Sequence, residues 1–377
     1  MIFEIIAGAA IIAVALWEAF EGVVLPRRAT RHFRFTRLFY RSTWHPWRAI
    51  AQQMRRPKRR ETFLSFYGPL SLLFLFIFWG SGLIFGFGLL YHGVSRGNPA
   101  LPNFLTCLYL SGSTFFTLGL GDVIPHAWAE RWLVVTESGL GFGFFALVFS
   151  YLPVIYQAFS RREVSIVLLD ARAGSPPTAA ELLRRHAGAD AWKELQQLLH
   201  DWERVSAETL ESHVSYPGVA YFRSQHDNES WVAAIAAILD ATALLIASTD
   251  NECSRQARLT FAMCRHTVAD LAQIFNAAPQ SPTRDRLPPD ELHRLRATLA
   301  EAGFHLRDSE ASNEKLTKLR GMYEPHLESL GRFLLMEVPP WILSKEIVDN
   351  WRTTVWGRIS GLATPAREEV TVDDHAD

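Results

Sequence analysis

The most constraining feature of the sequence is a run of thirty residues, Thr62–Tyr91, that contains no charged side chain. A helix needs about 20 consecutive apolar residues to cross a bilayer, so this run predicts a membrane-spanning helix. Trp132–Phe159 is a second such run, interrupted only by Glu137, and Ile2–Leu25 is a third that carries three glutamates. An acid at position 4 and bulky residues at its end distinguish the third run from a cleaved signal peptide. We therefore expect three transmembrane helices.

Basic residues in the loops predict how these helices are oriented. Twelve Arg and Lys residues and no acid lie between Arg27 and Arg60, whereas the stretch 92–102 contains only Arg96. Cytoplasmic loops are enriched in Lys and Arg. Residues 27–61 and the region after residue 160 are therefore expected in the cytoplasm, and the amino terminus outside. The chain is then a multi-pass protein of a bacterial-type inner (plasma) membrane.

Composition separates the chain into two halves and excludes several functions. Residues 1–160 carry 14 Lys and Arg against 7 Asp and Glu, whereas residues 161–377 carry 24 against 32. The three cysteines have no paired spacing, so they indicate neither a disulfide framework nor a zinc site. The sequence has no Walker loop and no HExxH or GxSxG motif. We expect no enzyme activity, no catalytic residues, no cofactor or resident metal, and no nucleic-acid partner.

The loop between the second and third spans carries the most specific motif, TLGLGD at residues 117–122. Irregular backbone at membrane depth is tolerated only where it lines water or protein, which predicts a re-entrant pore loop. To replace the water around a K⁺ ion, carbonyl oxygens must face it at successive levels. Glycine at every second position supplies the positive φ that this arrangement requires. One chain gives one oxygen per level, so four chains must surround the axis. The predicted K⁺-binding residues are Thr117, Leu118, Gly119, Leu120 and Gly121.

The pattern Thr114-x-x-Thr117-x-Gly119-x-Gly121-Asp122 resembles the signature of the potassium channel pore family. The resemblance covers roughly residues 63–160 and implies an outer helix, a pore helix, a filter and an inner helix in a K⁺-conducting homotetramer. With its single pore loop, the chain is similar to a bacterial single-pore subunit. The family's usual filter has Val and Tyr where this chain has two leucines. The second leucine resembles the second pore loops of animal two-pore-domain potassium channels.

The leucine at position 120 bears on the predicted function. In the family, the Tyr hydroxyl at this place bonds to the pore helix and braces the filter, whereas Leu120 has no donor. We predict a potassium-selective channel that conducts passively. A weakly selective cation channel is the first alternative. A membrane-anchored signalling or scaffold protein with a structural pore loop is the second.

Three polar residues near the filter are candidates for supporting roles. Asp122 closes the motif at the outer mouth, where a ring of acids would attract cations. Glu137 lies in the third span near the level of the filter, and an acid at that depth is a functional candidate by default. A structural hydrogen bond to the pore helix, through Ser113 or Thr114, is the interpretation that we favour. Thr114 and Glu137 are therefore predicted to support the filter.

Glycines in the third span suggest either a hinge or close helix packing. Gly139, Gly141 and Gly143 alternate with apolar residues, and no strand precedes them, which argues against a nucleotide-binding loop. Glycine allows close packing between membrane helices. Pro153, ten residues further on, introduces a possible kink into the same helix. All four residues are gate-hinge candidates, and tight packing without motion stays the alternative.

The basic segment at residues 27–60 is predicted to lie on the inner leaflet. Its arginines recur every third residue from Arg28 to Arg37, a spacing that resembles a voltage-sensing helix. Pro26 at its start, dense flanking charge and interleaved aromatic residues favour an interfacial amphipathic segment instead. We therefore expect the segment to bind membrane lipid, in particular anionic lipid.

The region after residue 160 has helical periodicity. Helices are predicted near 178–187, 189–213, 229–249, 252–276, 289–303 and 312–335, while residues 163–169 fit either a short strand or the end of the inner helix. The predicted fold class is an all-α membrane protein with three transmembrane helices, a re-entrant pore helix and filter, and an α-helical cytoplasmic domain. The predicted organisation is a first transmembrane helix (1–26), a basic amphipathic cytoplasmic linker (27–61), an ion channel pore domain (62–160), a helical cytoplasmic domain (161–363) and a disordered acidic tail (364–377).

Overall fold

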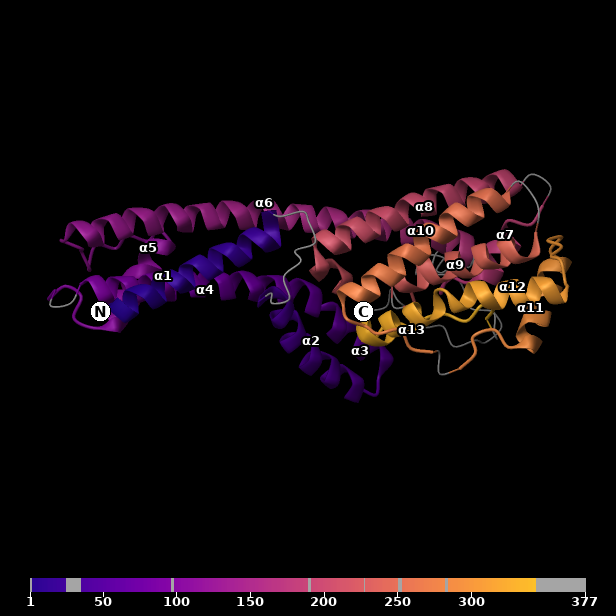
Figure 1. The fold of residues 1–377 in the computed structure, drawn as a ribbon, viewed down its shortest axis with the longest axis horizontal. Helices are drawn as coiled ribbons and strands as arrows, with labels where there is room; N and C mark the ends of the chain where they lie inside the picture. Colours follow the sequence, from indigo (N-terminus) through magenta and orange to yellow (C-terminus); the bar gives the residue numbers. More distant parts are fainter. Residues whose placement is uncertain are drawn as a thin grey trace, which may run out of the picture. The chain divides into compact units, whose positions relative to one another are not determined.

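The described part of the chain is helical and contains no strand, which confirms the predicted all-α membrane fold. A computed structural model of the protein describes residues 2–24, 35–95, 98–188, 191–226, 228–249, 253–281 and 284–343. The elements are α1 (Ile2–Ala19), η1 (Phe20–Val24), α2 (Phe35–Gln53), α3 (Pro57–Ser65), α4 (Tyr67–Val94), α5 (Phe104–Phe115), α6 (Trp128–Ala173), α7 (Ala179–Arg185), α8 (Ala191–Ser215), η2 (Pro217–Tyr221), α9 (Trp231–Ser248), α10 (Cys253–Ile274), α11 (Pro289–Glu301), α12 (Glu310–Gly321) and α13 (Glu324–Leu334) (Figure 1).

The chain divides into two compact units, and the division does not follow the order of the sequence. The first unit holds the described residues up to Gln157 together with the short segment Ser215–Phe222. The second unit holds Ala158–Val214 and the described residues from Arg223 onward. We call them the pore unit and the helical unit. The segment 215–222 therefore packs with the pore unit although the chain on both sides of it belongs to the helical unit.

Among the described residues, four helices are long and apolar enough to cross a membrane: Ile2–Gly22, Pro57–Val94, Trp128–Ala173 and Trp231–Ser248. The second and third contain the predicted spans 62–91 and 132–159, and the first covers residues 2–22 of the span predicted at 2–25. The fourth is α9, and every one of its residues is buried inside the helical unit. A helix that is apolar on all sides is stable in water only when neighbouring helices cover it. We therefore interpret α9 as the core helix of a bundle.

A buried ion pair explains why the apolar helix α9 contains Asp240. Arg286 Nη2 lies 2.6 Å from Asp240 Oδ2, and the Tyr323 hydroxyl donates to Oδ1 of the same carboxylate at 2.6 Å. Burial raises the pKa of Asp240 above its ordinary value, and the Arg286 charge opposes that shift. A buried charge is tolerated when it is paired and hydrogen-bonded, as it is here.

Helices α1 and α4 pack closely in the pore unit, as their ribbons show in Figure 1. A Cβ atom on Gly8 would lie 2.6 Å from the carbonyl oxygen of Gly86, so the backbones touch where both helices have glycine. Small residues permit this approach between membrane helices. The core around this contact includes Ile12, Ala15, Leu83, Phe87, Tyr91, Leu101, Cys107, Leu110 and Phe115.

The basic segment is only partly described. Residues 35–53 form α2 and residues 57–65 form α3, separated by a break at 54–56 that precedes Pro57. The arginines at positions 28, 31 and 34 lie outside the described residues, as does the predicted acidic tail 364–377. The buried side of α2 carries aromatic residues, including Tyr40 and Trp44, while Arg41 on the same helix is exposed.

The structure decides one open alternative in the helical unit and corrects one predicted helix. Residues 163–169 are not a strand, because α6 continues through them to Ala173. The helix predicted at 312–335 is two helices, α12 and α13, with a turn at residues 322–323. The break has a local cause: proline disfavours helical conformation in the residue before it and clashes with the preceding turn, and Pro325 therefore begins a new helix.

Candidate functional site

The pore helix α5 is positioned by a cap at its start. The side-chain oxygen of Asn103 accepts hydrogen bonds from the backbone N–H of Thr106 at 2.9 Å and from its hydroxyl at 3.1 Å. Asparagine is a favoured N-cap because its oxygen satisfies a free backbone donor. Helix α5 packs against α4, with Leu110 and Phe115 among its buried residues. With its start capped and one side packed on α4, α5 has a fixed position, and the TLGLGD loop begins two residues after its last residue, Phe115.

The backbone φ angle of the loop is positive at every second residue. Thr117, Gly119 and Gly121 have φ values of 57°, 57° and 77°. The positive φ predicted for the two glycines is confirmed. Thr117 adopts the same conformation, which is uncommon for a residue with a side chain. The turn is held at its base because the N–H of Leu118 donates to the carbonyl of Ser113 at 2.8 Å.

A lack of room for a side chain does not explain the glycines in this loop. A Cβ atom built on Gly119 or Gly121 would meet nothing within 4 Å, and the neighbouring leucines Leu118 and Leu120 are 61% and 66% exposed in the single chain. The constraint on the two positions is therefore backbone conformation. Alternating positive and negative φ is the arrangement that turns successive carbonyls toward one line, as a cation pathway requires.

Tyr109 connects the pore helix to the end of the loop. Its hydroxyl donates to Oδ2 of Asp122 at 2.8 Å. Leu120 has no hydroxyl that could bond to the pore helix. Here the hydroxyl belongs to Tyr109 on the pore helix, and the acceptor is Asp122 in the loop. Sequence reasoning missed this residue, although a tyrosine on the predicted pore helix, thirteen residues before the closing aspartate, was a visible signal.

Glu137 joins three helices behind the loop. Its side chain is fully buried, and it accepts hydrogen bonds from the Tyr91 hydroxyl on α4 at 2.8 Å and from the Ser111 hydroxyl on α5. The bond to the pore helix is therefore made through Ser111, and the predicted partners Ser113 and Thr114 were wrong. Thr114 is also buried and interacts with the same Tyr91 hydroxyl.

The three glycines of α6 occupy different environments. A Cβ on Gly141 would overlap the backbone carbonyl of Phe115, so this glycine lets α6 touch the end of the pore helix. Gly139 and Gly143 have nothing within 4 Å of such an atom. Pro153 lies inside α6, which continues as one helix on both sides of it. The packing alternative thus fits Gly141, while Gly139, Gly143 and Pro153 stay hinge candidates.

A second buried glutamate, not singled out by the sequence, fixes the loop that follows the filter. Glu130 is 1% exposed and accepts hydrogen bonds from the Asn98 amide at 2.9 Å and from the backbone N–H groups of His126 and Ala127 at 3.1 and 3.2 Å. His126 and Ala127 immediately precede α6, and a glutamate in the first turn that accepts from the N-cap N–H fixes the start of the helix, as in a capping box. Glu130 also ties the loop before the pore helix to the loop after the filter.

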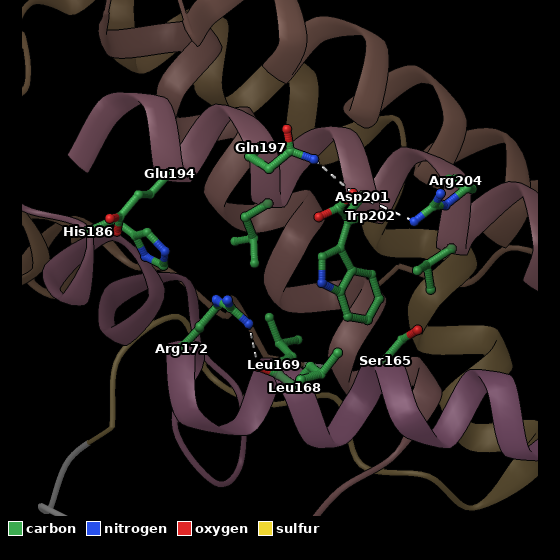
Figure 2. Close-up of a pocket in the computed structure, with 12 residues that line it drawn as sticks. Ser165, Leu168, Leu169, Arg172, His186, Glu194, Gln197, Asp201, Trp202 and Arg204 are labelled. Atoms are coloured by element: carbon green, nitrogen blue, oxygen red, sulfur yellow. Dashed lines mark hydrogen bonds and ion pairs between the residues drawn. The ribbon is translucent and has the colours of Figure 1, made fainter. Parts of the chain in front are cut away.

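The helical unit contains an open cavity of about 560 Å³ between α6 and α8 (Figure 2). Its polar side chains bond largely to one another or to the backbone: Asp201 accepts from Gln197 at 3.0 Å and lies 3.7 Å from Arg204, and Arg172 donates to the carbonyl of Leu168 at 3.2 Å. Among the described residues, no group of three His, Cys, Asp or Glu side chains is placed to hold a metal. The cavity is lined by Ser165, Leu168, Leu169, Arg172, His186, Glu194, Gln197, Leu198, Asp201, Trp202, Arg204 and Val205.

Comparison with known proteins agrees with the geometry of the pore unit. Residues 72–157 match a family model described as "Ion channel". Neither the curated proteins nor the solved structures gave a match. The matched stretch begins in α4, contains α5 and the TLGLGD loop, and ends in α6 beyond Pro153. The chain therefore carries an ion channel domain, in keeping with its resemblance to the potassium channel pore family.

Proposed function

We propose that the chain is one subunit of a homotetrameric, potassium-selective channel that conducts passively. The observation that carries the proposal is the alternating backbone of Thr117, Gly119 and Gly121 at the end of a capped pore helix. Each chain offers one carbonyl per level, so a complete ring of oxygens needs four chains. The function requires no chemical step and hence no catalytic residue or cofactor other than the permeating K⁺.

Purified protein in liposomes tests this proposal. Vesicles loaded with K⁺ are expected to release it when the protein is present and the charge movement is balanced by a proton carrier. The signalling or scaffold alternative predicts no release above that of empty vesicles. The weakly selective alternative predicts equal release of Na⁺. Leu120 favours that alternative, whereas the bond between Tyr109 and Asp122 supplies a brace in place of the missing hydroxyl.

We propose further that the amino terminus lies outside and that α2, α3 and the helical unit lie in the cytoplasm. A single cysteine at exposed Ser42 in α2 is then expected to resist a membrane-impermeant thiol reagent in intact cells, while one at exposed His126 reacts. The native cysteines Cys107, Cys253 and Cys264 are all buried, so background labelling should be low. Permeabilised cells serve as the control, since both positions should then react. Labelling of the α2 position alone in intact cells would reverse the orientation.

We propose that α2 and α3 bind the anionic inner leaflet. Arg55, Arg56, Lys58 and Arg59 are exposed around the break between the two helices. Each basic residue near an anionic surface contributes about 1 kcal/mol, and salt screens this attraction. Open probability is expected to depend on anionic lipid and on internal ionic strength.

The double variant Arg55→Gln/Arg59→Gln should lose most of the lipid dependence. It removes about 2 kcal/mol of attraction per chain, which corresponds to a roughly thirtyfold weaker association with lipid. Arg255→Gln/Arg258→Gln, which removes two exposed arginines from α10 in the helical unit, is the matched control. The measurement is the open probability of both double variants in neutral and in anionic bilayers. Equal lipid dependence of the two double variants would contradict the assignment.

A further inference from the structure

The short connection between α8 and α9, residues 215–222, belongs to the pore unit and packs inside it. Tyr221 of η2 stacks on Tyr40 with ring centroids 5.6 Å apart and an interplanar angle of 7°. It also lies 4.9 Å from the ring of Trp44 and 5.1 Å from the ring of Tyr67. Tyr40 and Trp44 belong to α2, and Tyr67 begins α4. All four rings are buried, so η2 completes an aromatic core in the pore unit.

Two glycines allow this close approach. A Cβ on Gly218 of η2 would lie 2.5 Å from the hydroxyl oxygen of Tyr40 and 3.4 Å from Leu72. A Cβ on Gly68 of α4 would lie 2.7 Å from the ring of Phe222. Each glycine faces a bulky residue on the other side of the contact. The sequence on both sides therefore accommodates the connection, as expected for a specific docking site.

The same connection touches the inner helix beside its hinge candidate. The ring of Tyr216 lies 5.4 Å from that of Tyr151, at an interplanar angle of 74°. Tyr151 is in α6, two residues before Pro153. A bend of α6 at Pro153 would move Tyr151 relative to α2 and α4, and the residues from Tyr216 to Phe222 contact all three helices.

Both ends of the connection are fixed to one place on α6 within the helical unit. At the end of α8, Arg162 Nη1 lies 3.2 Å from Nε2 of His213. After the connection, the hydroxyl of Ser224 donates to Glu163 Oε1 at 3.3 Å. Arg162 and Glu163 pair with each other at 3.1 Å and are 5% and 6% exposed. Removing one partner of a buried charge pair is strongly destabilising, so these anchors are firm.

His213 is held as an acceptor at this anchor. It is fully buried, and burial together with the nearby Arg162 charge lowers the pKa of His213 well below its ordinary value. The neutral imidazole accepts from the arginine through Nε2. On the other side of the connection, Arg223 donates to the carbonyls of Leu334 and Leu335, which adds an anchor on α13.

We infer that residues 215–222 are a coupling element that transmits changes in the helical unit to the inner helix at Pro153. This inference rests on the proposed channel function. The anchors at Arg162 and Glu163 tie the element to the helical unit, and the aromatic core ties it to α2 and α4. In the described conformation α6 passes through Pro153 as an unbroken helix. In this inference the unbent α6 is the closed conformation, so the docked element restrains the bend and its release favours opening.

Two substitutions test the coupling element in bilayer recordings. Gly218→Ala forces it away from Tyr40, and Tyr216→Ala removes its ring from Tyr151. Each is expected to raise open probability at least tenfold with the reversal potential unchanged. Gly321→Ala at a helical glycine with nothing within 4 Å, and Tyr216→Phe, which keeps the ring, are the matched controls and should behave as wild type. An unchanged or lower open probability in both test variants overturns the inference.

Hydrogen exchange on the purified protein separates this inference from the channel proposal. If the wild-type protein carries no current, the channel proposal fails, but docking is still measurable. Gly218→Ala should speed amide exchange in α2 and around Tyr151 at least tenfold relative to Gly321→Ala. Equal exchange in the two variants rejects the coupling element whether or not the protein conducts. If Gly218→Ala does not assemble, Tyr216→Ala, which only removes a ring, replaces it in both measurements.

Discussion

Replacing Gly119 or Gly121 with alanine is expected to abolish potassium flux while membrane insertion is retained. Both glycines have positive φ, at 57° and 77°. An L-residue in the left-handed region costs about 1–2 kcal/mol, and alanine relieves this cost by returning to negative φ. That return rotates the adjoining peptide planes and turns their carbonyls away from the pathway. In a tetramer the change occurs four times around each ring.

The space around these glycines makes the experiment specific. A Cβ at either position meets no other atom within 4 Å, so alanine does not disturb packing in the single chain. Gly321→Ala is the matched control, because this glycine also has open space around its Cβ but lies in a helix outside the pore unit. It should conduct as wild type does. Normal K⁺ flux through both the Gly119→Ala and the Gly121→Ala protein would contradict the assignment of the filter.

Replacing Glu137 with alanine is the second change with a large expected effect. The substitution removes the carboxylate that the Tyr91 and Ser111 hydroxyls share. Ser111 keeps the carbonyl of Ile84 on α4 at 2.8 Å, and Tyr91 keeps its interaction with Thr114. An intramolecular hydrogen bond contributes about 0.5–1.5 kcal/mol net, and two such bonds are lost in each chain. We expect K⁺ flux to fall at least tenfold and the ratio of K⁺ to Na⁺ flux to fall with it, because α5 loses this hydrogen bond to α6 beside the filter.

The ratio of the two fluxes separates a positioning role from a purely structural one. A protein that is merely less stable would lose flux of both ions in proportion. Glu137→Gln keeps the size of the side chain and one acceptor. Its K⁺ flux and its ratio of K⁺ to Na⁺ flux should therefore lie between those of wild type and Glu137→Ala. Thr136→Ala is the matched control, since this exposed hydroxyl bonds only within its own helix, to the carbonyl of Trp132 at 2.9 Å. A wild-type flux ratio in Glu137→Ala would contradict the positioning role.

Features that depend on local sequence could be predicted. The length and apolar character of the run 62–91 require a spanning helix whatever surrounds it. The positive φ of Gly119 and Gly121 follows from the spacing of glycine, because no other residue adopts that conformation freely. The helix predicted near 229–249 is α9, because its apolar run continues from Trp231 to Ser248 without a glycine or proline.

Features that depend on contacts between distant residues could not be predicted. The partners of Glu137 come from positions 46 and 26 residues earlier in the chain. The depth of Glu137 in the third span, near the level of the filter, placed its bond two or three residues too far along α5. The sequence of residues 215–222 indicates only a turn between two helices, and nothing in it predicts packing against α2 and α4. The sequence showed a tyrosine on the predicted pore helix, but its bond to Asp122 requires the loop to fold back toward α5, and helical periodicity does not predict the path of a loop.

The most direct test of the central claim is a planar bilayer recording of the purified protein with K⁺ on one side and an equal concentration of Na⁺ on the other. A potassium-selective channel gives a current whose reversal potential lies far from zero, with the sign set by K⁺ flowing toward the Na⁺ side. A reversal potential near zero would contradict potassium selectivity, and the absence of current would contradict conduction itself.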